Sequence, residues 1–250
     1  MSDDVKATLS KVPEVTLIFW IVKILATTLG ETGGDMLSMS MNLGYALSTL
    51  IFFLPFIVLV ALQIQAKRFL PWLYWAVIVG TTLAGTTMAD FADRSMHVGY
   101  PGGTTILFAL VVLSLVVWKI SVGTVSVNNI VTHKAEAFYW ITILFSNTLG
   151  TALGDWTSEG TGFAGGVYLF LGLIAVVALL FYFTKISHTV LFWAAFILTR
   201  PLGAALGDFL DKPHKEGGLA LSRYSGSAVL LVLMAAFLLI FRQRPAQRTH

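Results

Sequence analysis

The sequence contains no cysteine among its 250 residues. Disulfide bonds, thiolate metal sites and thiol catalysis are therefore excluded. Charge is also scarce, because Asp, Glu, Lys and Arg make up 12% of the chain, against roughly 25% in soluble domains. Hydrophobic residues make up 56%, and residues 105–117 and 167–183 carry no charge at all. A chain this apolar lacks the polar surface that water requires, so lipid is the solvent that fits it.

Other signals are missing as well. The five histidines fall in predicted loops, at helix ends or in the tail, which makes a deep imidazole metal site unexpected. There is no His-Glu-x-x-His motif and no pairing of a nucleophile with a base, so we do not expect an enzyme. The acidic N-terminus lacks the basic segment and cleavage site of a secretory signal, and we expect the first hydrophobic stretch to be a retained span. The formal charge of +3 lies in short loops and the tail, which favours membrane orientation over nucleic-acid binding.

A fourfold internal repeat organises the chain. Trp20, Trp75, Trp140 and Trp193 each open a hydrophobic run, at intervals of 55, 65 and 53 residues. Ten residues after each Trp stands a glycine, fourteen after it a small residue, and fifteen after it an aspartate. These are Gly30, Gly85, Gly150 and Gly203; Gly34, Ala89, Gly154 and Gly207; and Asp35, Asp90, Asp155 and Asp208.

Each aspartate is followed by a polar or Gly-rich turn and a second apolar run. The pattern predicts an all-α, polytopic membrane helical bundle of about eight transmembrane helices, made of four parallel two-helix repeats in one membrane domain over residues 1–250. The repeats cover about 14–66, 70–121, 135–185 and 188–243. The predicted spans are 14–37, 43–65, 71–92, 103–121, 136–157, 164–184, 188–210 and 219–241.

The distribution of Lys and Arg predicts the orientation. Ten of them lie at the N-terminus, between repeats or in the tail, four lie in or near the turns within repeats, and Lys23 and Arg200 lie within spans. The positive-inside rule then places both termini in the cytoplasm, and in a bacterium the membrane is the inner one.

Four tandem two-span repeats, each with a Trp opening its first helix and a Gly-x-x-x-Gly-Asp-like end, resemble a bacterial membrane family described as a repeat of unknown function. The resemblance extends from about Pro13 to Phe241. It implies the repeat architecture and a bacterial membrane, and it implies no activity. The residues themselves must therefore indicate the mechanism.

The first helix of each repeat carries one polar stripe. Positions seven, eleven, fifteen and eighteen after each Trp share a helical face. They are Thr27, Glu31, Asp35 and Ser38; Thr82, Thr86, Asp90 and Asp93; Asn147, Thr151, Asp155 and Ser158; and Arg200, Ala204, Asp208 and Asp211. The small residues at positions ten and fourteen let helices approach closely in lipid. We expect the four first helices to lie inside with converging stripes, and the second helices to face lipid.

The stripe predicts a cation site. If each Trp marks the cytoplasmic interface, Glu31 lies about 16 Å deep, near the midplane, and the aspartates about 22 Å deep. Carboxylates at such depth are costly unless they face protein, water, a partner charge or an ion. We expect Glu31, Asp35, Asp90, Asp155 and Asp208 to bind metal, with Arg200, Lys23, Thr27 and Asn147 completing the site. Oxygen ligands of this kind suit Mn²⁺, Mg²⁺, Ca²⁺ or protons, as substrate rather than cofactor.

Purely structural roles for these residues, and two other functions, are alternatives to the cation site. Asp155 and Asp208 could cap a turn, Asp93, Asp211 and Glu159 could be solvated turn residues, and Lys23 could extend to the cytoplasm. A transporter of a small organic or anionic solute would use Arg200 and Lys23 as anchors. A membrane sensor or subunit would use the stripe only to set helix register. The expected partners are the lipid bilayer and a small cation or solute, not nucleic acid, and a homo-oligomer is left open.

Overall fold

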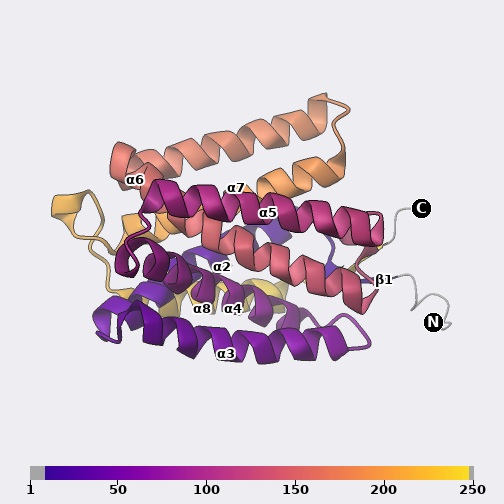
Figure 1. The fold of residues 1–250 in the computed structure, drawn as a ribbon, viewed down its shortest axis with the longest axis horizontal. Coiled ribbons are helices and arrows are strands. Elements are labelled where there is room, and N and C mark those ends of the chain that lie inside the picture. The colour runs from indigo at the N-terminus through magenta and orange to yellow at the C-terminus, as the bar shows by residue number, and fades with distance from the viewer. Residues whose placement is uncertain (1–8, 248–250) are drawn as a thin grey trace.

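The computed structural model describes residues 9–247, which are helical apart from one short pair of antiparallel strands (Figure 1). The α-helices are α2 (Leu17–Asp35), α3 (Gly44–Gln65), α4 (Pro71–Asp90), α5 (Tyr100–Val122), α6 (His133–Phe183), α7 (His188–Asp211) and α8 (Arg223–Ile240). The π-helical segments η1 (Met36–Ser40) and η2 (Phe91–Ser95) continue α2 and α4. Two 3₁₀ turns, η3 (Val127–Asn129) and η4 (His214–Glu216), and the strands β1 (Leu9–Pro13) and β2 (Pro245–Gln247) complete the described part of the chain.

Helix α6 contains two of the predicted helices. Gly162, with φ 73° and ψ 164°, interrupts its helical backbone, a conformation that glycine adopts without steric cost. Figure 1 shows the chain turning back on itself within α6. The first half packs in the interior, whereas most of residues 168–183 in the second half are exposed, with Phe170 buried against α7.

Several predicted boundaries differ by a few residues from those observed, and two of these differences have a clear physical reason. Helix α5 begins at Tyr100 rather than at 103, because Pro101 fits the first turn of a helix, where its missing N–H is not needed. Helix α8 begins at Arg223 rather than at 219. The residues before Arg223 form backbone hydrogen bonds outside α8, because the N–H groups of Leu219 and Leu221 donate to the carbonyls of Phe209 and Leu210 at the end of α7.

Small residues close the four inner helices into a ring. The glycines ten residues after each Trp lie directly against position seven of the next repeat: Gly30 against Thr82, Gly85 against Asn147, Gly150 against Arg200, and Gly203 against Thr27. A side chain at any of these glycines would clash with or crowd the neighbouring helix. Helices α2, α4, the first half of α6 and α7 thus contact one another in a closed cycle, as the spacing of small residues predicts.

The outer helices carry apolar surface outward. The exposed side chains of α3 include Leu50, Leu54 and Val58, and α5 and α8 are similarly apolar. Within residues 9–247, six helices are long and apolar enough to cross a membrane, namely α2 with η1, α3, α5, α6, α7 and α8. The chain is therefore an all-α protein with several candidate membrane spans.

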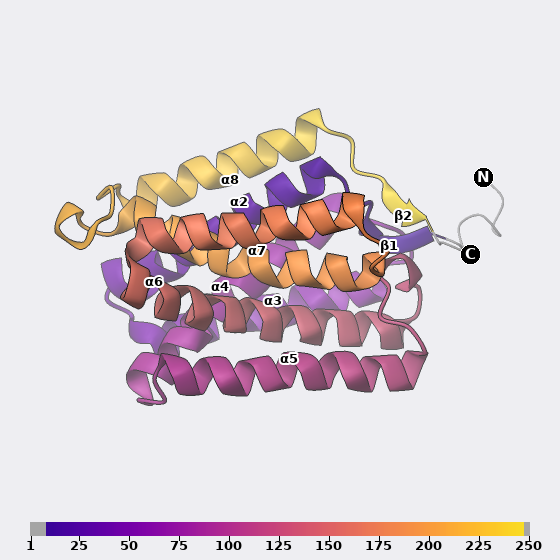
Figure 2. The same cartoon turned by 90° about the horizontal axis from the view of Figure 1, so that it is seen from above.

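The two ends of the bundle differ in composition. At one end, here called the sheet end, β1, β2 and η3 lie together; at the other, here called the loop end, lie η1, η2 and residues 212–222 (Figure 2). The tryptophans pack at the sheet end. Trp75, Trp140 and Trp193 are buried in an aromatic cluster with Tyr74 and Tyr139, so these rings pack against protein at this end of the bundle. Their ring surface is large enough to fill a core, and the helix ends meet there.

Candidate cation site

The polar residues between the inner helices lie in three layers. The layer nearest the sheet end contains Lys23, Thr27 and Asn147, all fully buried. The Lys23 ammonium donates to Asn147 Oδ1 at 3.3 Å and lies 4.2 Å from the centre of the Phe196 ring. Asn147 in turn donates to Thr81 Oγ1 at 2.7 Å. The alternative in which Lys23 extends to the cytoplasm is therefore wrong, because its amine is held by groups from α6 and α7.

Thr27 belongs to the same layer and has its own partners. Its hydroxyl contacts two backbone carbonyls, those of Ile24 at 2.9 Å and Thr199 at 3.2 Å. A threonine that bonds the preceding turn and the neighbouring helix is fully satisfied within the protein. Thr27 therefore joins α2 to α7 in this structure, and its hydroxyl contacts no carboxylate.

Arg200 occupies the middle layer. Its two terminal nitrogens donate to Glu31 Oε2, each at 3.2 Å, and Nη2 also donates to Thr86 and to Thr151 Oγ1. These three partners are position eleven of the first three repeats. The fourth repeat has Ala204 there, so the guanidinium from position seven extends into the layer that its own repeat leaves apolar. Arg200 and Glu31 form a buried, charge-assisted pair that joins all four inner helices.

The four aspartates form the third layer, toward the loop end, and are paired in twos. Arg94 bridges Asp90 at 2.9 Å and Asp155 at 3.0 Å. Lys212 bridges Asp35 at 2.6 Å and Asp208 at 2.9 Å. Each base therefore binds the aspartate one helical turn before it and the aspartate of another repeat, which ties the helices together in pairs.

Arg223 adds a third base to this layer. Its guanidinium lies 3.4 Å from Asp35 and 2.5 Å from Asp211. The side chains of Asp211 and Asp93 are nearly inaccessible, so the interpretation of these two as solvated turn residues is wrong. Burial occurs because η2 and the start of the 212–222 loop fold over the ends of the inner helices. Glu159, by contrast, is exposed.

The predicted metal ligands do not meet at one point. One carboxylate oxygen from each of Glu31, Asp155 and Asp208 lies within 4.8 Å of the others, and the same holds for Asp35, Asp208 and Asp211. Asp90 belongs to neither group. The structure thus forms an inner triad (Glu31, Asp155, Asp208) and an outer triad (Asp35, Asp208, Asp211) that share Asp208, and the outer triad includes Asp211, which is not among the predicted ligands.

The sequence interpretation missed the bases that pair with the aspartates. Arg94, Lys212 and Arg223 were counted only as loop charges that set orientation. A signal was present for two of them, since Arg94 follows Asp90 and Lys212 follows Asp208 by four residues, the spacing of neighbours on a helix. Arg223 has no such signal, because the loop that returns it to Asp35 and Asp211 is not periodic.

Lys212 is the base whose protonation the structure constrains most directly. Burial of the side chain lowers its pKa, but the nearby carboxylates of Asp208, Asp35 and Asp211 have the larger combined effect, and the pKa of Lys212 is raised well above its ordinary value. The amine therefore remains a charged ammonium throughout the physiological pH range.

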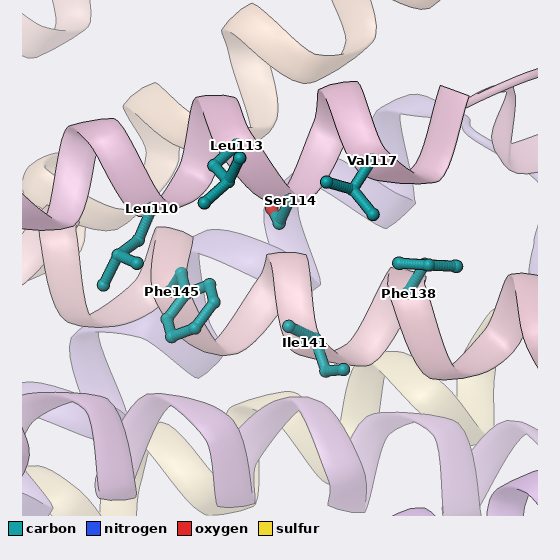
Figure 3. A pocket seen from close by; sticks show the side chains of 7 residues that line it. All are labelled: Leu110, Leu113, Ser114, Val117, Phe138, Ile141 and Phe145. Atoms are coloured by element: carbon teal, nitrogen blue, oxygen red, sulfur yellow. The ribbon is translucent and has the colours of Figure 1, made fainter. Parts of the chain in front are cut away.

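An apolar pocket between α5 and α6 offers no comparable chemistry. Its volume is about 180 Å³, and it is lined by Leu110, Leu113, Ser114, Val117, Phe138, Ile141 and Phe145 (Figure 3). The one hydroxyl in its lining, that of Ser114, already bonds to Val111 and Thr142. The lining of the pocket is otherwise hydrocarbon, so the candidate site is the polar interior of the bundle.

Comparison with known proteins agrees with the repeat. A family model described as Repeat of Unknown Function (DUF347) matches the chain four times, over residues 18–69, 73–124, 138–187 and 191–244. No curated protein and no solved structure matches the chain significantly.

Proposed function

Because the chain belongs to this repeat family, whose description assigns no activity, we propose from the site itself that the protein is a membrane transporter for a cation. The cation binds on carboxylates between α2, α4, the first half of α6 and α7. The substrate of the transporter is a hard cation. It is either a divalent metal ion such as Mn²⁺, Mg²⁺ or Ca²⁺, or a cation whose transport is coupled to protons.

The proposal includes eight membrane crossings. Each repeat supplies two, α6 supplies two of the eight on either side of Gly162, and all four repeats run in the same direction. The exposed apolar surface of the outer helices supports this placement. The ten Lys and Arg residues at the N-terminus, between repeats and in the tail, against four in or near the turns within repeats, support an orientation with the sheet end in the cytoplasm and the loop end outside, in the inner membrane of a bacterium.

The inner triad is the observation that carries the proposal. Three carboxylates from α2, α6 and α7 bring their oxygens within 4.8 Å of one another while all three residues are buried. Asp155 Oδ1 is buried without a hydrogen-bond partner. Like charges held so close in a low dielectric are unfavourable unless a cation lies among them. In this structure the three carboxylates are held by three different bases: Arg200 binds Glu31, Arg94 binds Asp155 and Lys212 binds Asp208.

Arg200 gives the site a mechanism. As a tethered counter-ion it neutralises Glu31 when no cation is bound, and an incoming cation displaces it from the carboxylate. Because Arg200 also binds Thr86 and Thr151, its displacement loosens contacts among all four inner helices. Cation binding thereby changes the packing of the bundle, which a carrier requires.

The same contacts favour a cation over an anionic solute. The guanidinium of Arg200 already binds Glu31 and two hydroxyls, and Lys23 is enclosed by Asn147 and Phe196. An anion would have to displace Glu31 and then remain beside the aspartate layer, where the like charges repel it.

Flux measurements with purified protein in liposomes test the proposal. We expect Mn²⁺ uptake that falls at least about tenfold in Glu31→Gln and in Asp155→Asn, since each removes one ligand. The matched control is Glu159→Gln, which neutralises an exposed acid four residues from Asp155 and leaves uptake unchanged.

Three other results would contradict the proposal. Uptake of Mn²⁺, Ca²⁺ and protons at the level of empty liposomes would indicate a sensor or subunit. Cation uptake that is unchanged in both variants would exclude the inner triad. Uptake of an organic anion that is lost in Arg200→Gln would favour the solute transporter.

A further inference from the structure

The outer triad has an occupant in this structure, and that occupant is a side chain. Asp35 comes from the end of α2, and Asp208 and Asp211 come from the end of α7. The ammonium of Lys212 lies 2.6 Å from Asp35, 2.9 Å from Asp208 and 3.9 Å from Asp211. A single positive charge thus occupies a cluster of three carboxylates.

Lys212 lies at the edge of the buried cluster. Its backbone is fixed, because its N–H donates to the carbonyl of Asp208 and its carbonyl accepts from Ala220. Its side chain is 12% exposed, whereas that of Arg200 is 0% exposed. Of these two cations, the Lys212 ammonium is therefore the one closer to solvent, beside the exposed residues of the 212–222 loop.

The charges at the outer triad match a divalent cation when Lys212 is absent. Arg223 contacts Asp35 and Asp211 and neutralises one of the three carboxylates. Two negative charges remain, of which the Lys212 ammonium balances only one. A divalent ion balances both. Asp211 Oδ1 is buried and has no hydrogen bond, because the Lys212 ammonium lies 3.9 Å from it, beyond hydrogen-bond distance.

We propose that Asp35, Asp208 and Asp211 form a second, outer site for a divalent cation, and that the Lys212 ammonium competes with the ion for it. Asp208 belongs to both triads. An ion in the outer site therefore already contacts one of the three ligands of the inner triad. The role of the outer site as a stage in transport rests on the proposed function. Its capacity to bind a divalent ion does not.

Mn²⁺ binding to purified protein, counted by equilibrium dialysis and electron paramagnetic resonance, tests the outer site. Lys212→Met removes the competing charge, and we expect it to bind one Mn²⁺ per chain more than the wild type. Lys212→Arg keeps a cation in place, and we expect no gain. Adding Asp211→Asn or Asp35→Asn to Lys212→Met removes the extra ion, and melting temperatures identify any variant that does not fold.

The outcomes separate this proposal from the proposed function. No extra Mn²⁺ in folded Lys212→Met, or an extra ion that persists with both aspartates replaced, would overturn the outer site. Combining Lys212→Met with Glu31→Gln and Asp155→Asn disables the inner triad. One remaining ion that requires Asp211 would then establish the outer site even if liposomes show no flux.

Discussion

The two ends of the inner four-helix ring are held by different forces. At the sheet end, aromatic rings pack on one another, and the hydroxyls of Tyr74 and Tyr139 share a hydrogen bond of 2.5 Å. At the loop end, aspartates from all four repeats are joined by three bases. The same helices therefore enter an aromatic cluster, with the single Lys11–Glu136 ion pair beside it, at one end and a network of ion pairs at the other.

This difference indicates which end responds to ions. Aromatic packing stabilises through buried area and edge-to-face contacts, which no dissolved ion replaces. An ion pair loses little when another cation takes the place of the base, because the carboxylate keeps a positive partner. We therefore expect the packing of the sheet end to stay the same when a cation binds, and the ion pairs of the loop end to rearrange.

The largest effect is expected for Arg200. Arg200→Gln leaves Glu31 buried without its charged partner, and we expect a loss of about 3–5 kcal/mol in unfolding free energy. Glu31→Gln in the same chain removes the unpaired charge and restores most of that loss. Chemical denaturation of the two single variants and the double variant in detergent measures the coupling. Additive losses would contradict the pairing.

A smaller effect is expected at the loop end. Arg94→Gln removes the base that bridges Asp90 and Asp155. We expect a loss of about 1–3 kcal/mol, because two buried carboxylates lose a charged donor. Mn²⁺ should raise the melting temperature of this variant more than that of the wild type. An equal rise in both would mean that the base and the ion do not substitute for one another.

At the sheet end, Tyr74→Phe removes one hydroxyl of the buried tyrosine pair. The expected loss is about 1 kcal/mol, the contribution of one neutral hydrogen bond. In contrast to Arg94→Gln, added Mn²⁺ should shift the melting temperature of this variant by the same amount as in the wild type. A selective rescue of Tyr74→Phe by Mn²⁺ would contradict the separation of the two ends.

The smallest effect is expected from pH. The folded pKa of Lys212 is raised above the ordinary value of 10.5, so its stabilising contribution is fully present below that value and is lost only as pH rises through the folded pKa. The stability difference between wild type and Lys212→Met should therefore be the same at about pH 7 and about pH 9. In Lys212→His the same carboxylates raise the pKa of the imidazole above its ordinary value of about 6.5, so Mn²⁺ binding at the outer triad should strengthen as pH rises through that raised value. A wild type that loses the Lys212 contribution between these two pH values would contradict the raised pKa.

Much of the ring could be predicted from sequence, because its spacing is local. Gly30 and Thr82 are strictly placed relative to their tryptophans, and close helix contacts need small residues at fixed intervals. The buried position of Arg200 follows from its depth in an apolar helix. The contact with Glu31 is consistent with the uneven repeats, since Ala204 leaves one polar position empty.

Other features depend on contacts that spacing does not encode. A tryptophan near a helix end suits a membrane interface and an aromatic core equally well, and only the convergence of helix ends decides for Trp75. The pairing of β1 with β2 depends on bringing the two ends of the described chain together. The role of Arg223 depends on the path of an irregular loop. The grouping of the carboxylates into two triads depends on how far α2, α6 and α7 are shifted along their axes relative to one another, which the sequence does not give.

The central claim is that the inner triad holds a cation in place of Arg200. Anomalous X-ray scattering from crystals grown with Mn²⁺ tests it most directly. We expect a peak between Glu31, Asp155 and Asp208, with the guanidinium of Arg200 moved away from Glu31. Crystals in which Arg200 still binds Glu31 and no peak lies among these three carboxylates would contradict it.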